Sequence, residues 1–157
     1  MTPSADTTVR GAAARRLPDK SGEGEWMRKL RIRFRHGEPA ASLRHEVRSL
    51  LDPVCPPDTV EDALLVTSEL VQNVTQHTGS DGELAMTVTS KDVLIEVFDG
   101  DRRMPVRQAP DARRIGGRGL LLVSATAQQW GTRMQAKGKV VWARIAVPAG
   151  ADTRAAA

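Results

Sequence analysis

The sequence predicts an α+β protein in which a mixed, mainly antiparallel sheet is covered on one face by three helices. Two periodicities support this class. Apolar and polar residues alternate in five stretches, which is typical of strands with one buried face, and apolar residues recur at helical spacing in three others. The predicted order is strand, helix, helix, two strands, a long loop, helix and two strands, which fits a two-layer sandwich.

Length and composition allow one domain with a substantial core. The chain has 157 residues, of which 40% are hydrophobic and 27% charged, as in ordinary soluble proteins. No apolar run approaches the roughly 20 residues of a membrane span, and no secretory signal is evident. The single cysteine, Cys55, has no partner for an internal disulfide. We therefore expect no membrane association and a reducing, cytoplasmic location.

Positive charge is concentrated in the amino-terminal part of the chain. Residues 1–37 contain nine Lys or Arg and four Asp or Glu, whereas residues 38–157 contain fourteen and fifteen. We predict a disordered basic tail over residues 1–25, a single folded domain over residues 26–148 and a second disordered tail over residues 149–157. The basic tail either contacts nucleic acid or an acidic partner, or is a solubilising extension, and we favour the extension.

The domain is predicted to begin with a strand and two helices. Residues 30–35 alternate strictly between apolar and basic, which indicates a strand with an arginine face. A helix over residues 40–51 follows, and the prolines after it end the helix. Residues 58–61 have the form of a capping box, and apolar residues at helical spacing predict a second helix of about five turns that ends near residues 78–79.

A polar column lies along the last turns of this second helix. Glu69, Asn73 and His77 are spaced four residues apart, so their side chains lie one above the other beside the apolar stripe. Taken alone, such a column fits a solvated helix edge better than the wall of a cleft.

The second half of the chain predicts two hairpins on either side of a long loop. Residues 84–90 and 93–99 alternate around a short polar turn, and the second strand ends at Asp99. The following 20 residues lack periodicity, contain six arginines and end in a glycine-rich stretch before an apolar helix that starts at Leu120. Free N–H groups and the positive helix dipole at such a start suit phosphate. Strands over 130–135 and 140–147 complete the domain.

These segments, in this order, resemble the Bergerat-fold ATP-binding domain of gyrase-type ATPases and histidine kinases. Within that superfamily the chain looks most like the small bacterial anti-sigma-factor serine/threonine kinases. The resemblance covers roughly residues 30–148. It rests on TSELVQNVTQH at 67–77, IEVFD at 95–99 with Pro105 after it, GRGLLLV at 117–123, and Gly131 with KVVWA at 139–143.

The resemblance implies a role for each candidate site residue. Glu69 would be the catalytic base, Asn73 the Mg²⁺ ligand, and Asp99 the acceptor of a hydrogen bond from the amino group of adenine. His77 would either face the nucleotide or cap the end of its helix. The other residues on the ATP side would be Pro105, Gly117, Arg118, Gly119 and Leu120.

As a function, the resemblance implies a cytoplasmic ATP-binding regulator that phosphorylates a serine or threonine of an anti-anti-sigma (STAS-type) partner and sequesters a sigma factor. Homodimers are common in the resembling family. The sequence differs from the Asp-x-Gly-x-Gly motif that is usual in this superfamily, because Asp101 and Arg103 replace its two glycines. This departure motivates an alternative, a catalytically weak nucleotide-sensing, partner-switching module. A nucleic-acid-binding domain that uses Arg31, Arg33 and Arg35 is a third class, but it lacks a base-reading motif.

Overall fold

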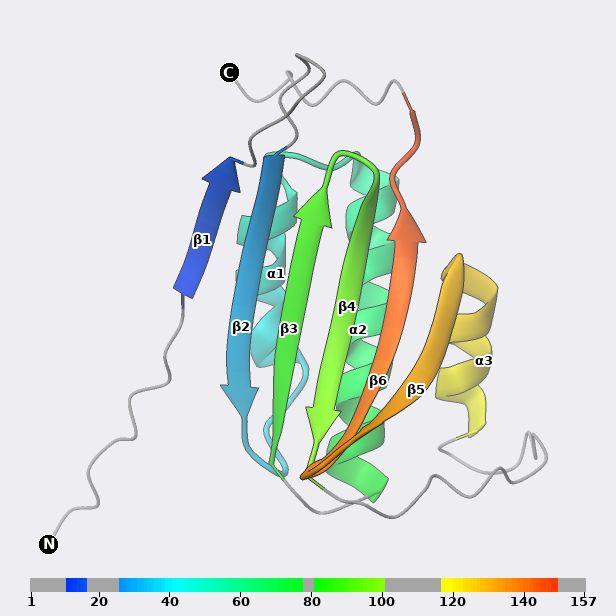
Figure 1. Cartoon of the computed structure of the whole chain (residues 1–157). Helices are drawn as coiled ribbons and strands as arrows, with labels where there is room; N and C mark the ends of the chain where they lie inside the picture. Colours follow the sequence, from blue (N-terminus) through cyan, green and yellow to red (C-terminus); the bar gives the residue numbers. More distant parts are fainter. Residues whose placement is uncertain (1–10, 17–25, 78–80, 101–116, 150–157) are drawn as a thin grey trace, which may run out of the picture.

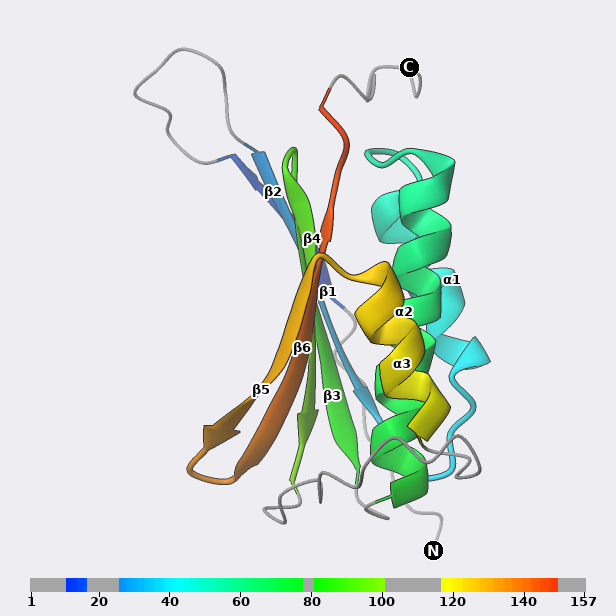
Figure 2. The ribbon, with the colours of Figure 1, turned by 90° about the vertical axis from the view of Figure 1, so that its right-hand side faces the viewer.

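The computed structural model describes residues 11–16, 26–77, 81–100 and 117–149. It contains a six-stranded sheet with three helices on one of its faces (Figures 1 and 2). The predicted α+β class with one helix-covered face is confirmed. The strands are β1 (Gly11–Arg16), β2 (Trp26–Phe34), β3 (Gly82–Thr89), β4 (Asp92–Asp99), β5 (Gln129–Gln135) and β6 (Gly138–Ala146), and the helices are α1 (Ala41–Leu51), α2 (Pro57–His77) and α3 (Gly117–Thr126).

The strands follow the order β1-β2-β3-β4-β6-β5 across the sheet, and every pairing among these described strands is antiparallel. The expectation of a mixed sheet is therefore wrong. The chain crosses from β4 through α3 to β5, which runs parallel to β4, but β6 then returns between the two strands. Because β6 separates β4 from β5, the two parallel strands are not neighbours.

The sheet has an edge strand, β1, that the sequence does not indicate. Gly11–Arg16 pairs antiparallel with β2, with Gly11 opposite Arg31 and Arg16 opposite Trp26. Its sequence, GAAARR, shows no alternation, so the strand depends on the backbone of β2 rather than on a pattern of its own. The prediction of a tail is wrong for these six residues; residues 1–10, 17–25 and 150–157 lie outside the described residues.

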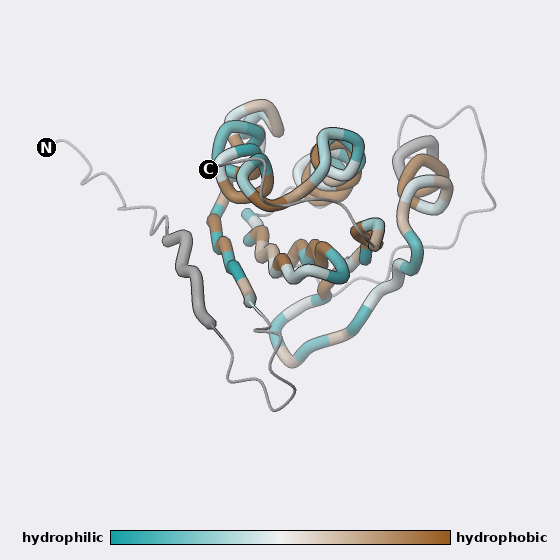
Figure 3. The backbone as a smooth tube through the Cα atoms, turned by 90° about the horizontal axis from the view of Figure 1, so that it is seen from above, coloured by the Kyte–Doolittle hydropathy of each residue, from teal (hydrophilic) through white to brown (hydrophobic). Residues whose placement is uncertain are grey.

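The core lies between the helix layer and the inner face of the sheet (Figure 3). Strand alternation sets this face, as predicted: Leu30, Ile32 and Phe34 of β2 are buried, whereas Arg31 and Arg33 are exposed on the outer face. These two arginines lie 3.4 and 3.5 Å from the carboxylate of Glu83 on β3. The predicted arginine face is therefore partly neutralised by its neighbouring strand.

Helix α2 begins at Pro57, so the predicted capping box is wrong. Proline suits the first helical position because its φ is already helical and its missing N–H has no partner there anyway. Asp58 then lies in the first turn, near the positive end of the helix dipole. Glu61 accepts a 2.8 Å hydrogen bond from Arg48 of α1 instead of capping α2. This bond marks the flank of α2 that faces α1.

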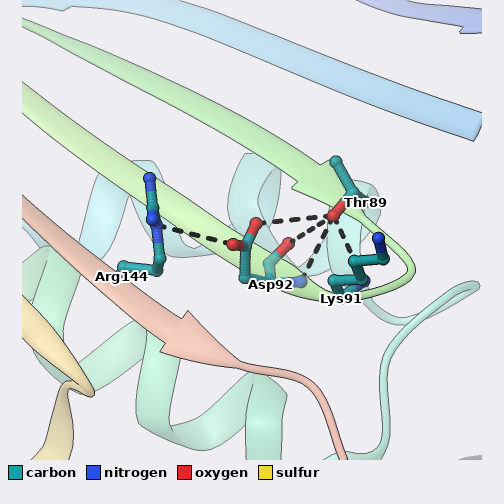
Figure 4. A network of polar contacts seen from close by, with 4 residues as sticks. All are labelled: Thr89, Lys91, Asp92 and Arg144. Atoms are coloured by element: carbon teal, nitrogen blue, oxygen red, sulfur yellow. Dashed lines mark hydrogen bonds and ion pairs between the residues drawn. The ribbon is translucent and has the colours of Figure 1, made fainter. Parts of the chain in front are cut away.

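The β3–β4 turn is held by a small polar network (Figure 4). The Thr89 hydroxyl accepts hydrogen bonds of 3.2 Å from the backbone N–H groups of both Lys91 and Asp92. The carboxylate of Asp92 also lies 3.4 Å from Nε of Arg144 on β6. This network fixes the register of β4 and β6 at the end of the sheet opposite to Asp99.

Candidate functional site

Three predicted site segments lie at one end of the molecule. The last turns of α2, the end of β4 and the start of α3 all lie at the bottom of Figure 1, and the rotated view agrees. Helix α2 also contacts β4, β6 and α3. The fold therefore brings together segments that are far apart in the sequence.

Asp99 is a carboxylate on the buried face of the sheet. It is the last residue of β4 and follows Val93, Ile95 and Val97 on the inward side of that strand, and it is fully buried, with 0% of its surface exposed. A buried carboxylate needs partners, because removing it from water is costly. Asp99 is thus a buried hydrogen-bond acceptor at the margin of the core.

On one side of Asp99 the site is bounded by Phe34. Gly82 of β3 is the cross-strand neighbour of both Asp99 and Phe34. A Cβ atom on Gly82 would collide with the Phe34 ring and would lie 2.8 Å from the carbonyl oxygen of Phe98. Glycine is therefore required for the aromatic ring to lie this close to the strand that separates it from Asp99.

On the other side lies Lys139, which was not among the predicted site residues. Lys139 is directly opposite Asp99 in the β4–β6 register, and its Nζ is 3.6 Å from Asp99 Oδ2. Both side chains are buried, with 6% and 1% exposed. A signal for Lys139 exists in the sequence: counting back by twos from the apolar residues Ile145, Ala143 and Val141 puts position 139 on the core face.

The β5–β6 turn packs directly against the end of β4. Gly138 has a φ of +156°, and a Cβ atom built on it would lie 3.0 Å from Cα of Gly100 and 3.1 Å from the carbonyl carbon of Asp99. The carbonyl oxygen of Asp99 would be closer still. Gly138 thus permits the close approach of two backbone segments, and this approach fixes the position of Asp99.

Glu69 and Asn73 lie half-buried on α2. The buried Val66 precedes them by three and seven residues, so the three share one flank of the helix. The Arg48–Glu61 bond marks the flank nearest α1, and α3 lies on the other side of α2 in Figures 1 and 3. A polar pair thus lies where the core meets the surface, one turn apart.

Helix α3 begins at Gly117, three residues before the predicted start at Leu120. Gly117, Arg118 and Gly119 therefore form the first turn of the helix and do not precede it. The N–H groups of a first turn have no partner within the helix, so this end retains the donors that suit an anion. Leu120 is half-buried.

The structure describes the predicted site residues to different extents. Pro105 lies outside the described residues, and for His77, Gly117, Arg118 and Gly119 the backbone is described but the side-chain surroundings are not. Among the described residues there is no group of three or more His, Cys, Asp or Glu side chains placed to hold a metal ion. Within the same residues, none of the helices combines the length and the hydropathy needed to cross a bilayer.

Comparison with known protein families places most of the chain in one of them. The model of a histidine kinase-like ATPase domain matches residues 37–145. The match runs from the connection between β2 and α1 to the end of β6, and it includes Glu69, Asn73, Asp99 and Lys139. No curated protein matches the chain.

Proposed function

The chain belongs to the histidine kinase-like ATPase family, and from this premise we propose that it is a cytoplasmic anti-sigma-factor kinase. It binds Mg-ATP at the end of the molecule that carries Asp99, transfers the γ-phosphate to a serine or threonine of a STAS-type anti-anti-sigma partner, and sequesters a sigma factor when that partner is phosphorylated. One observation carries the proposal. The end of β4, which carries the buried acceptor Asp99, and the last turns of α2, which carry the polar pair Glu69 and Asn73, lie at the same end of the fold.

In this proposal Asp99 recognises the base. Its carboxylate lies on the core face, where a planar, largely apolar base would be shielded from water, and it accepts a hydrogen bond from the exocyclic amino group. A hydrogen bond to a charged acceptor in such a site contributes about 1.5–3 kcal/mol. Losing the amino group, or the carboxylate charge, should therefore weaken binding strongly.

Asn73 and the first turn of α3 would hold the phosphates. The Asn73 side-chain oxygen is a suitable ligand for Mg²⁺, which keeps several waters and is bound largely through phosphate oxygens. When bound, this cation neutralises charge that develops on the phosphates during transfer. Free N–H groups at the start of α3 supply the remaining contacts to the anion.

Glu69 would act as the catalytic base. The oxygen of the attacking serine or threonine forms a bond to the γ-phosphorus, and the bond from that phosphorus to the β–γ bridging oxygen breaks. ADP leaves with the electron pair, and the hydroxyl proton passes to the Glu69 carboxylate. Glu69 is half-buried, so it is shielded on one side and open to a partner protein on the other.

Labelled ATP and a panel of STAS-type antagonist proteins test this function. Wild-type protein should transfer label to at least one antagonist, and Glu69→Gln should reduce the transfer rate about 100-fold or more while leaving ATP affinity within about threefold. Glu61→Gln is the matched control, since Glu61 lies on the same helix but is 64% exposed and bonded to Arg48. Transfer that is absent, or equal in the wild type and Glu69→Gln, would remove the kinase proposal.

A second candidate function is nucleotide sensing without transfer. Asp101 and Arg103 stand where the resembling family usually has glycines that let the backbone approach the nucleotide. In this case calorimetry would detect ATP binding that Asp99→Asn abolishes, with no turnover and no labelled partner. Binding of the partner proteins that changes with added ATP would then be the functional readout.

A further inference from the structure

Lys139 is a buried cation that the proposed chemistry leaves without a role. It belongs to the inward row of β6, with Val141, Ala143 and Ile145, all of which are core residues. Its direct neighbour across the β4–β6 register is Asp99. A long apolar residue at this position would simply extend the core, whereas a lysine must be desolvated and must lose its side-chain freedom.

The side chains of Lys139 and Asp99 form an ion pair that is longer than a hydrogen bond. Nζ of Lys139 lies 3.6 Å from Oδ2 of Asp99, which is longer than the roughly 2.7–3.2 Å of an N–H···O hydrogen bond. The two groups are neighbours in the β4–β6 register, and both side chains are buried on the inner face of the sheet. Together they present an acceptor next to a donor.

We propose that Lys139 is a second base-recognition residue. It donates a hydrogen bond to the ring nitrogen beside the exocyclic amino group, and that amino group donates a hydrogen bond to Asp99. The proposal rests on the proposed nucleotide site and specifies how that site selects its base. Adenine carries an acceptor nitrogen on each side of its amino group, N1 on the Watson–Crick edge and N7 on the opposite edge. An Asp–Lys pair complements either of these donor–acceptor edges, whereas Asp99 alone reads only the donor.

A structural role for Lys139 makes a different prediction. If its ammonium only compensates the charge of the buried Asp99 carboxylate, removing it should weaken all nucleotides by the same factor. If it contacts the ring nitrogen, its removal should weaken only those bases that still carry that nitrogen. Discrimination between base analogues therefore separates the two roles, and it does so by binding rather than by activity.

The test combines three proteins with four ligands in calorimetric titrations. The proteins are the wild type, Lys139→Met, and Lys137→Met as a control, since Lys137 is an exposed lysine in the same hairpin turn. The ligands are ATP, 1-deaza-ATP, 7-deaza-ATP and purine riboside triphosphate. The two deaza analogues each lack one ring acceptor, and the riboside lacks the amino group.

We expect one deaza analogue to bind the wild type about 10-fold or more weakly than ATP, since hydrogen bonds to charged groups are strong. The analogue that shows the loss identifies the edge that Lys139 reads. In Lys139→Met that ratio should fall below about threefold, and in Lys137→Met it should stay as in the wild type. Equal binding of ATP and both analogues by the wild type would overturn the proposal, as would an unchanged ratio in Lys139→Met.

Further measurements distinguish a variant that does not fold from a wrong assignment of Lys139 and from a wrong nucleotide site. If Lys139→Met does not fold, Lys139→Arg takes its place as a variant that retains a hydrogen-bond donor. The affinities of the wild type for ATP and the two deaza analogues then still show whether a ring nitrogen is bound. Weak binding of the riboside with equal binding of both deaza analogues would support Asp99 and refute Lys139. If no nucleotide binds the wild type, the proposed function fails and the proposal for Lys139 falls with it; ATP binding without phosphotransfer leaves the analogue ratios decisive.

Discussion

Gly138 is a position where one added methyl group should disturb both the fold and the placement of Asp99. A Cβ atom there would lie 3.0 Å from Cα of Gly100 and 3.1 Å from the carbonyl carbon of Asp99, with the Asp99 oxygen closer still. Carbon atoms normally pack at about 3.5–4.0 Å. In Gly138→Ala the β5–β6 turn and the end of β4 must therefore separate by roughly 0.5 Å or more.

The expected loss of stability follows from what the methyl group meets. Overpacking typically costs about 1–3 kcal/mol, and the upper end applies because the obstacle is backbone and not a flexible side chain. The same movement separates Asp99 from Lys139, which form a buried ion pair. We therefore expect a destabilisation of about 3 kcal/mol and ATP affinity reduced about 10-fold or more.

Two other glycines provide matched controls. Nothing lies within 4 Å of a Cβ atom built on Gly100, although Gly100 is adjacent to Asp99. Gly100→Ala should therefore stay within about 0.5 kcal/mol of the wild type. Gly37 is equally open but has a φ of +79°, so Gly37→Ala isolates backbone strain of about 1–2 kcal/mol.

Urea unfolding followed by tryptophan fluorescence, with the three Trp residues as probes, gives the free energies of unfolding. Calorimetry with ATP gives the affinities. If Gly138→Ala unfolds within about 0.5 kcal/mol of Gly100→Ala and binds ATP as the wild type does, the turn does not fix Asp99 and the steric argument is refuted.

Three further predictions test the packing of the fold. Burial raises the pKa of the Cys55 thiol to about 11, against an opposing effect of Arg28, so alkylation at pH 8 should be about 100-fold slower than for a free thiol and should accelerate up to pH 11; a rate equal to that of a free thiol would contradict this burial. The exposed Arg48–Glu61 pair should show a coupling below about 1 kcal/mol in a double-mutant cycle and lose it in high salt. Ile95 is fully buried, so Ile95→Ala should cost about 2–5 kcal/mol in urea unfolding and Ile95→Val only about 1, and equal losses would argue against a tightly packed centre.

Periodicity predicts the elements that bury a face of their own. The alternation of residues 30–35 and the helical spacing of residues 60–74 both correspond to observed elements, β2 and α2. Strand β1 could not be found in this way, because GAAARR has no apolar face and forms only by pairing with β2. Helix starts are also poorly specified: α2 begins at a proline and α3 at a glycine, each a few residues before the pattern of apolar side chains.

The positions of the candidate site residues were predictable where a single segment carries the signal. Asp99 stands at a strand end and Glu69 and Asn73 on a helix edge, so their positions follow from local structure. Lys139 shows what local structure omits. In the sequence it lies next to a glycine in a tight turn, and its proximity to Asp99 depends on the β4–β6 register, which is a tertiary property.

The position of β6 between β4 and β5 has a consequence for how the protein assembles. Asp99 and Lys139 are 40 residues apart in the chain, and β6 follows the other five described strands in the sequence but is not an edge of the sheet. Until β6 has inserted, β4 presents an unpaired edge, which is a template for association with other chains. If ATP binds at the Asp99 end, as proposed, it stabilises only chains in which this insertion is complete. Bound nucleotide would then stabilise the molecules in which β6 has inserted. Molecules in which β6 has not inserted would remain exposed to aggregation and proteolysis.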